Sequence, residues 1–303
     1  MPTTQQTALR GGIISAVSAY TMWGIAPLYF KLIQHISADE ILVHRVVWST
    51  LLLLIVVLLS NKWQGFIKVA TQPKMVLRLT ISASFLAVNW FMFIWAVNNN
   101  HLLDASLGYY INPLLSVALG VIFLGERLRP WQIFAVGLAF VGVVIQLVMI
   151  GSLPMISLAL AGTFGIYGLL RKQMHIDSFV GLLIESLMML PIALVYWLLF
   201  LETSTSNILL NGWSLNTTLI CAGIVTTAPL LCFTAAAKRM TLTALGFFQY
   251  IGPSIMFVLA TFYYQEPLYF AKLLTFACIW AALAIFSFDS IKARRSTKKI
   301  AIN

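Results

Sequence analysis

The sequence predicts an all-α integral membrane protein with ten transmembrane helices in two inverted five-helix repeats. Three observations carry this prediction: a shortage of charged residues, apolar runs of about 20 residues, and an internal match at a spacing of about 140 residues. Of the 303 residues, 60% are hydrophobic and only 9% are charged, whereas a water-soluble domain carries about 25% charged residues. The composition therefore excludes a water-soluble enzyme.

Ten apolar runs are each long enough to cross about 30 Å of hydrocarbon at about 1.5 Å per residue. The predicted spans are 12–33, 41–60, 76–97, 104–124, 131–150, 154–170, 179–201, 215–236, 243–264 and 268–288. The connections between them are short, so no soluble domain is expected, and the lipid bilayer is the first predicted partner.

The distribution of positive charge predicts the orientation. Sixteen of the 19 Lys and Arg residues fall in segments that face the cytoplasm if the N-terminus is inside, Lys31 and Lys272 fall outside, and Arg45 lies within a span. Because cytoplasmic loops carry an excess of Lys and Arg, both termini are predicted in the cytoplasm. The net charge of +10 is thus explained by topology, and no nucleic-acid partner is expected.

An internal repeat is visible in two segments. Gly108–Pro113 aligns with Phe248–Pro253 at an offset of 140 residues, and Trp23–Ile25 aligns with Phe164–Ile166 at an offset of 141. Two matches at nearly the same offset favour a duplication over chance similarity.

The repeat divides the chain into residues 1–150 and 151–303. Each half holds five predicted spans, and because five is odd, the second half enters the membrane from the side opposite to the first. Inverted repeats of this kind are typical of alternating-access transporters, in which the substrate site lies near the bilayer midplane between the halves.

No catalytic or metal-binding pattern is present. The chain lacks an HExxH, a GxSxG and a P-loop motif, so no enzyme activity and no ATP-driven pump are expected. Cys221, Cys232 and Cys278 lie in apolar runs without CxxC spacing, which predicts buried small side chains rather than a metal site or a disulfide. No cofactor is therefore expected.

Prolines inside predicted spans are the candidate hinges: Pro27, Pro113, Pro229 and Pro253. A proline in a helix frees the carbonyl four residues before it, so Pro113 frees Tyr109 and Pro253 frees Gln249. Since Tyr109 and Gln249 are repeat equivalents, two kinks are expected symmetrically, where freed carbonyls line a wet cavity. The alternative is that these prolines only bend packed helices.

Two ionisable residues lie inside predicted spans, Arg45 and Glu185, again 140 residues apart. Arg45 is expected near the outer interface, where it snorkels or pairs with Asp39 or Glu40. Glu185 lies deeper without an evident partner, and burial disfavours its ionised form, as a proton-coupling carboxylate requires. The alternative is a structural carboxylate satisfied by hydroxyls or by a cation from another span.

Aromatic and polar residues inside the spans are the candidates for a substrate pathway. They are Tyr20, Trp23, Asn89, Trp90, Tyr109, Asn112, Tyr167, Gln249 and Tyr250. Tyr20 and Trp23 stand three residues apart and so share a helix face. Aromatic walls with a few polar groups suit flat or amphipathic organic solutes better than inorganic ions, although any single one of these residues could equally serve packing.

Several segments resemble the EamA branch of the drug/metabolite transporter superfamily. They are Ala19–Pro27, Ala38–Ile41 with His44–Arg45, Asn89–Trp90 with Ile94–Asn98, Ser106–Pro113, Leu124–Arg127, Gly223–Thr227 and Leu245–Pro253. The resemblance covers nearly the whole chain and implies ten helices in two inverted repeats, a bacterial inner-membrane location and an exporter or permease of small molecules. It supplies no agreed site residues, so the candidates above rest on physical argument.

These observations predict a secondary transporter of small organic metabolites or drugs that works by alternating access and is not an enzyme. The alternative is a non-transporting membrane assembly or sensor protein on the same scaffold. A midplane cavity beside Pro113 and Pro253 would favour transport, whereas a solid apolar centre would favour the alternative. The oligomeric state is open.

The predicted topology can be tested by labelling single cysteines from outside the cell. A cysteine at Ser206, in the connection after the seventh span, should react with a membrane-impermeant maleimide. A cysteine at Ser296 should be protected until the membrane is permeabilised. The reverse pattern would overturn the orientation.

Overall fold

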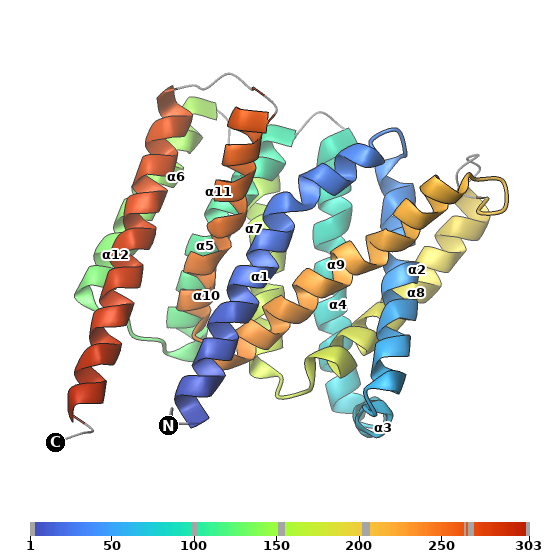
Figure 1. Cartoon of the computed structure of the whole chain (residues 1–303), viewed down its shortest axis with the longest axis horizontal. Helices are drawn as coiled ribbons and strands as arrows, with labels where there is room; N and C mark the ends of the chain where they lie inside the picture. Colours follow the sequence, from blue (N-terminus) through green and yellow to red (C-terminus); the bar gives the residue numbers. More distant parts are fainter. Residues whose placement is uncertain are drawn as a thin grey trace.

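The structure, a computed structural model, is built from helices throughout its described residues, which contain no β-strand. Those residues are 4–98, 102–150, 155–201, 207–263, 265 and 270–300, so Ser206 lies outside them. The helices run side by side in one bundle, and α1 begins at the same end at which α12 finishes (Figure 1).

Helices occupy all ten of the ranges predicted as spans. They are α1 (Thr4–Leu32), α2 (Ala38–Leu59), α4 (Pro73–Asn98), α5 (Leu102–Leu124), α6 (Pro130–Ile150), α7 (Met155–Gln173), α8 (Ser178–Phe200), α9 (Trp213–Arg239), α10 (Leu242–Gln249) with α11 (Ile251–Val258) and η2 (Leu259–Tyr263), and α12 (Phe270–Ile300). In the described residues, eight of these stretches are long and apolar enough to cross a membrane; α5 and α7 are the exceptions. The chain is a multi-pass membrane protein.

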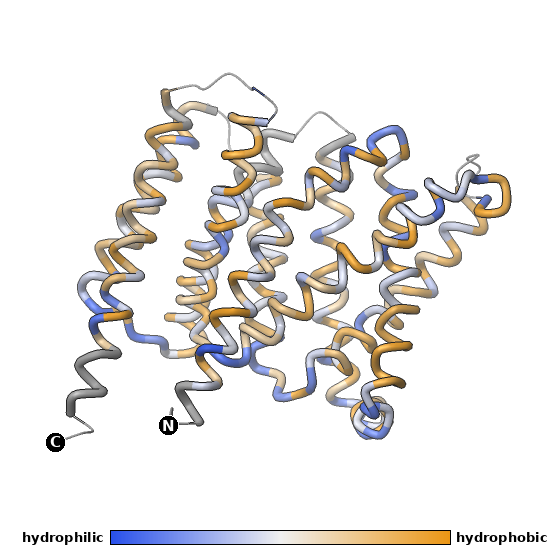
Figure 2. The backbone as a smooth tube through the Cα atoms, viewed as in Figure 1, coloured by the Kyte–Doolittle hydropathy of each residue, from blue (hydrophilic) through white to orange (hydrophobic). Residues whose placement is uncertain are grey.

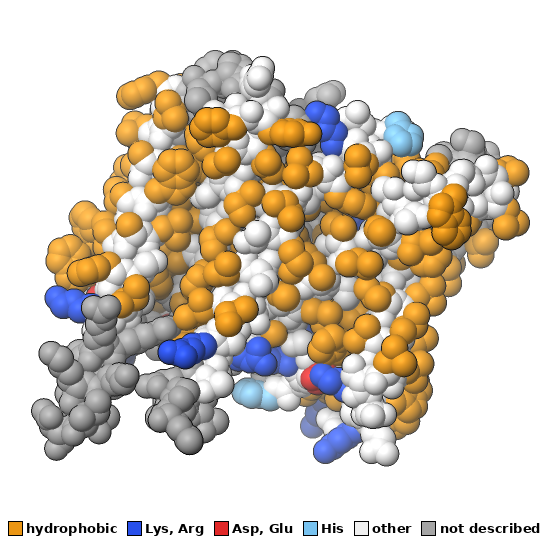
Figure 3. Space-filling view, in the orientation of Figure 1, with side chains coloured by type: hydrophobic (Ala, Val, Ile, Leu, Met, Phe, Trp, Pro, Cys, Tyr) orange, Lys and Arg blue, Asp and Glu red, His pale blue; other side chains and the backbone are white. Residues whose placement is uncertain are grey.

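The distribution of apolar and polar residues along the bundle is the one expected of a protein in a lipid bilayer. Apolar residues dominate the middle of the bundle, and polar residues collect in the connections (Figure 2). On the face shown in Figure 3, hydrophobic side chains cover the flanks, and Lys and Arg gather mostly at the end where α1 begins. Exposed apolar side chains along the flanks are what a lipid environment requires.

A short helix that the sequence did not predict, α3 (Trp63–Ala70), lies between α2 and α4. None of its residues is buried, and the rings of Trp63 and Phe66 stack at 4.8 Å. Its apolar residues Trp63, Phe66 and Ile67 are spaced three and four apart, so they share one face. This pattern is typical of a helix that lies along the membrane surface.

Of the two symmetric kinks that were predicted, only one interrupts a helix. The chain divides at Tyr250, so that α10 ends at Gln249 and Pro253 falls in the first turn of α11, where its missing N–H costs little. Helix α5 instead continues through Pro113. Pro27 lies within α1 and Pro229 within α9, and α8 contains Pro191, which the sequence did not single out.

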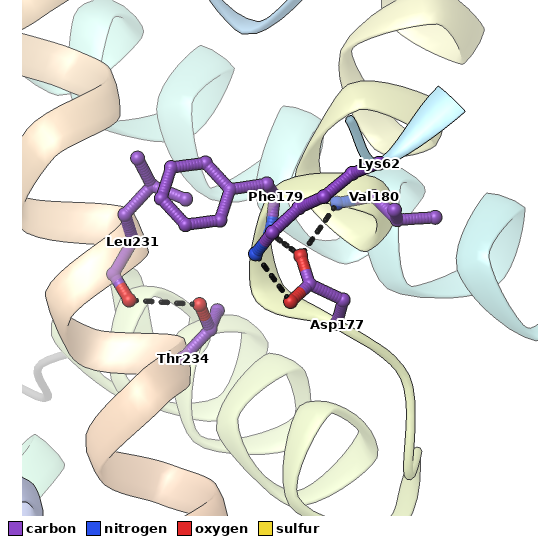
Figure 4. A network of polar contacts seen from close by, with 6 residues as sticks. All are labelled: Lys62, Asp177, Phe179, Val180, Leu231 and Thr234. Carbon is purple, nitrogen blue, oxygen red and sulfur yellow. Dashed lines mark hydrogen bonds and ion pairs between the residues drawn. The ribbon is translucent and has the colours of Figure 1, made fainter. Parts of the chain in front are cut away.

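Helices α2 and α8 pack against each other in antiparallel fashion, with a polar contact at each end of the pair. Near the start of α2, the Tyr196 hydroxyl of α8 donates a hydrogen bond of 2.7 Å to Asp39. Beyond the other end of α2, Lys62 forms a 2.7 Å ion pair with Asp177, the N-cap residue of α8 (Figure 4).

Close helix contacts depend on glycine at two positions. A Cβ at Gly223 of α9 would lie 2.6 Å from the carbonyl carbon of Trp48 on α2. A Cβ at Gly246 of α10 would lie 2.8 Å from the carbonyl oxygen of Pro113 on α5. Both distances are shorter than van der Waals contact, so any side chain would push these helices apart.

Two charged residues satisfy the ends of other helices, and one of them, Glu126, does so across the halves of the chain. Gly125, at a φ of +63°, ends α5 and turns the chain so that the Glu126 carboxylate accepts hydrogen bonds from the backbone N–H groups of Leu242 and Thr243. Lys172 donates to the carbonyl oxygens of Ala237 and Met240 at the end of α9. An acid at a helix N-terminus and a base at a C-terminus each complement the helix dipole.

The contact between Asp177 and Lys62 predicts a pH dependence of stability. Partial burial alone would raise the pKa of Asp177, but Lys62 and the backbone N–H groups of Phe179 and Val180 outweigh it and hold the pKa below its ordinary value. Because the folded-state pKa is lowered, the contact stabilises the protein at neutral pH and loses that effect as the pH falls through the lowered pKa.

We expect Asp177→Asn, which can still cap the helix, to cost less than about 1 kcal/mol. Asp177→Ala should cost a further 0.5–2 kcal/mol or so, because it also removes the cap. The difference in unfolding temperature between wild type and Asp177→Asn should shrink between about pH 6 and about pH 3. A constant difference over that range would show that the ion pair contributes nothing.

Candidate functional site

A small cavity lies between α2, α4, α8 and α9. Its volume is about 10 Å³, room for roughly one water molecule. Its polar lining residues are Ser49, Trp90, Glu185, Ser186, Thr226 and Thr227, and its apolar ones are Val46, Leu53, Leu86, Leu182, Met189 and Leu230. The cavity therefore joins hydroxyl groups from three helices to one carboxylate.

Arg45 lies at the end of the cavity nearer the start of α2. Its Nε donates a hydrogen bond of 2.8 Å to the Thr226 hydroxyl, and its guanidinium carbon lies 4.6 Å from the centre of the Trp90 ring. It is 5.8 Å from the centre of the Phe30 ring. Trp90 and Thr226 line the cavity, so the guanidinium lies next to two of its lining residues.

The predicted pairing of Arg45 with Asp39 or Glu40 is wrong. Asp39 instead accepts the hydrogen bond of Tyr196, and no carboxylate in the described part of the chain lies within ion-pair distance of Arg45. Thr226, at the middle of α9, supplies the partner that the sequence did not identify.

Glu185 lies toward the other end of the cavity. The sequence suggested a carboxylate without a partner, but the structure provides two. Oε1 of Glu185 is 3.5 Å from Nη1 of Arg171, and its Oε2 accepts a 3.5 Å hydrogen bond from the Tyr167 hydroxyl. The side chains of Arg171 and Glu185 are 0% and 1% exposed. The cation required by the structural alternative is thus in place.

Arg171 was counted among the cations of the cytoplasmic segments, and its burial was not predicted. Helix α7 continues to Gln173, beyond the predicted end of the span at 170, and carries Arg171 into the interior. Gly181 on α8 makes room for it, because a side chain there would collide with the guanidinium. Gly181 precedes Glu185 by one helical turn, a spacing that places both on one face and could have identified the site.

Three of the candidate aromatic residues meet in one buried cluster. Tyr20 and Trp23 of α1 have ring centres 5.5 Å apart, which confirms that they share a face. Tyr167 of α7 stacks on Phe233 of α9 at 5.9 Å, and Phe233 also contacts Tyr20 at 6.4 Å. Because the Tyr167 hydroxyl reaches Glu185, this cluster is continuous with the buried ion pair.

The remaining candidates join helices away from the cavity. Asn89 donates to the carbonyl oxygen of Leu160 and to the Thr163 hydroxyl, which links α4 to α7. Gln249 donates a 3.2 Å hydrogen bond to Ser116, and the Tyr250 hydroxyl donates one of 3.4 Å to the carbonyl oxygen of Tyr110.

Tyr109 is 43% exposed, and Asn112 has a buried side-chain oxygen with no partner among the described residues. No cavity-lining residue belongs to α5, α10 or α11, so the cavity does not lie beside Pro113 and Pro253.

The residues that sequence reasoning missed are small and polar: Ser49, Ser186, Thr226 and Thr227. A hydroxyl inside an apolar run is usually satisfied by its own helix, so its presence alone does not indicate a site. Consecutive threonines at 226 and 227, both buried, were the one local signal.

The buried pair predicts a specific pattern of stability. Glu185→Gln or Arg171→Met should each destabilise the protein by roughly 3–5 kcal/mol, because each leaves one buried charge without a partner. The double variant Arg171→Met with Glu185→Leu should recover most of that loss, since a well-packed apolar pair replaces a buried ion pair at little cost. Thermal unfolding in one detergent measures all three variants. Additive losses in the double variant would show that the two side chains do not interact.

Comparisons with known proteins assign the chain to a family. The EamA-like transporter family matches residues 10–148. A protein from Vibrio cholerae serotype O1 named as an uncharacterized transporter is 54% identical over 297 residues, 98% of each chain. Protein RarD of Escherichia coli strain K12 is 51% identical over 290 residues, 96% of this chain and 98% of that protein. A solved crystal structure, 18% identical, shares the fold with a TM-score of 0.72 over 92% of this chain and 96% of that one. The chain therefore belongs to the EamA-like transporter family of the drug/metabolite transporter superfamily, as a relative of the RarD proteins.

Proposed function

We propose that this protein is a secondary transporter that moves small organic metabolites or drugs across the bacterial inner membrane by alternating access. In this proposal residues 1–150 and 151–303 form two inverted five-helix repeats, and both termini face the cytoplasm. The observation that carries it is the packing of the helices, because the main helix contacts of one half have counterparts when the two halves are exchanged.

Exchange of the halves replaces α1, α2, α4, α5 and α6 by α7, α8, α9, α10–α11 and α12. The contact of α1 with α9 then becomes that of α7 with α4, and both exist. The contact of α2 with α9 becomes that of α8 with α4, and α5 with α7 becomes α11 with α1, and these contacts also exist. The remaining main contacts, α2 with α8, α5 with α10 and α6 with α12, join equivalent helices, as expected on a two-fold axis.

Individual glycine contacts support the same symmetry. A Cβ at Gly24 would lie 2.8 Å from Ile255, and a Cβ at Gly165 would lie 3.1–3.4 Å from Leu119 and Leu115. The offset of 141 converts Gly24 to Gly165, and the offset of 140 converts Ile255 to Leu115. Each half therefore places the same glycine against the equivalent residue of the other half.

The membrane orientation rests on the charge distribution. Sixteen cations on the predicted cytoplasmic side agree with the gathering of Lys and Arg at the end where α1 begins and α12 finishes (Figure 3). Two termini at the same end of the bundle require an even number of membrane crossings, as the ten proposed crossings do.

The cavity between α2, α4, α8 and α9 is the place at which we propose that substrate passes. In this conformation it holds about 10 Å³, so the helices must separate before an organic solute fits. A coupling role for Glu185 requires α7 and α8 to separate, so that a proton can replace Arg171 as its partner. The aromatic cluster around Phe233 offers the flat surfaces that organic solutes favour.

The test is a screen of metabolites and drugs in proteoliposomes, with and without a pH gradient. At least one solute class should enter saturably and faster than into empty liposomes. Ser186→Leu, which fills the cavity, should abolish this uptake, whereas Gly137→Ala, where a Cβ meets nothing within 4 Å, should leave it unchanged. Folded protein that moves no solute in any condition would favour the non-transporting alternative.

A further inference from the structure

Arg45 is a cation whose hydrogen-bonding capacity is largely unused. A guanidinium has five N–H donors, and here only Nε donates to a described residue, the hydroxyl of Thr226. The side chain is half-buried, with Trp90 and Phe30 beside its plane. The terminal nitrogens therefore have no partner within the described part of the chain.

A charge seven residues inside a membrane helix is costly unless it meets protein groups or water. Charged residues in such positions usually mark a path for solutes or ions. The other charge at the cavity, Glu185, is already held by Arg171 and cannot reach Arg45 from its place toward the opposite end of the α2–α8 pair. Among the described residues, no carboxylate lies within ion-pair distance of Arg45.

The surroundings of Arg45 select the chemistry of its partner. Stacking on Trp90 leaves the outer edge of the guanidinium fork free, and that edge matches the two oxygens of a carboxylate. A single unpaired cation neutralises a single negative charge, which favours a monoanion over a phosphate dianion. The rings of Trp90 and Phe30 provide an apolar surface for the rest of the molecule.

We propose that Arg45 binds the carboxylate of a small organic monoanion, whose apolar part lies over Trp90 and Phe30 at the edge of the cavity. This inference rests on the proposed function and narrows it, because it names organic monocarboxylates as the substrate class. An anionic lipid headgroup presents the same oxygens to a guanidinium, so the experiment must separate a free solute from a lipid.

Binding is measured by isothermal titration calorimetry in nanodiscs of zwitterionic lipid. The probes are phenylacetate, indole-3-acetate and hexanoate, each compared with its neutral amide. At least one acid should bind about tenfold or more tightly than its amide, the difference expected when a charged hydrogen-bond acceptor is removed. Arg45→Gln should abolish that difference, and Arg45→Lys should restore only part of it, because lysine lacks the planar fork.

Arg129→Gln serves as the matched control, since Arg129 pairs with Asp289 on α12 away from the cavity. If Arg45→Gln fails to fold, Thr226→Val provides the second variant, because it removes the hydrogen bond that Arg45 donates to a described residue. It should weaken binding of the acids several-fold and leave binding of the amides unchanged.

Three results would overturn the inference. In the first, the acids and their amides bind equally well. In the second, the acids bind equally well to wild type and to Arg45→Gln. In the third, no acid binds, but phosphatidylglycerol added to the nanodisc raises the thermal stability of wild type and not of Arg45→Gln, which would make this a lipid site. The proposed function is tested separately in proteoliposomes. Uptake of neutral or cationic solutes that is unchanged in Arg45→Gln would leave transport standing and refute the inference, whereas acids that bind through Arg45 but are never moved would refute transport alone.

Discussion

The antiparallel contact between α2 and α8 determines where everything else in the site lies. The start of α2 is tied to the end of α8 through Asp39 and Tyr196, and the end of α2 is tied to the start of α8 through Lys62 and Asp177. Arg45 and Glu185 each lie seven residues from the start of their own helix, so the antiparallel arrangement sends them toward opposite ends of the pair. The cavity lies between them, and neither charge can neutralise the other.

This arrangement means that each end of the helix pair has its own closing contact. A polar contact between Tyr196 and Asp39 secures one end, and the ion pair of Lys62 with Asp177 secures the other, supported by the deeper pair of Arg171 with Glu185. Between these ends, α2 and α9 pack in direct backbone contact at Gly223. Under the proposed alternating access, opening the cavity at one end would break one set of contacts while the other persists.

Much of the architecture could be predicted from the sequence because lipid imposes a length and a composition on every helix that crosses it. Helix α3 escaped prediction because its eight residues fall in the short gap between two long apolar runs. The prediction of two symmetric kinks was only half correct, since the helix is interrupted at Tyr250 but α5 continues through Pro113. Whether a proline interrupts a helix depends on packing around it, which a repeat in the sequence does not specify.

The site was less predictable than the fold. The sequence identified Trp90 and Glu185, which line the cavity, and Arg45, which is hydrogen-bonded to the lining residue Thr226. The spacing of Tyr20 and Trp23 correctly indicated a shared face. It could not identify their partners, because Thr226 and Arg171 approach from helices distant along the chain. The burial of Arg171 was not predicted, because a cation close to the end of an apolar run normally reaches water. The absence of a side chain at Gly181 makes room for it inside.

The most direct test of this account is a pair of distance measurements by double electron–electron resonance in nanodiscs. One spin-label pair at Ser37 and Phe200 reports on the first end of the α2–α8 contact, and a second at Leu59 and His175 reports on the other; all four positions are exposed. Alternating access predicts that a transported solute or a change of pH lengthens one distance while it shortens the other. Two distances that stay constant, or that lengthen together, would contradict it.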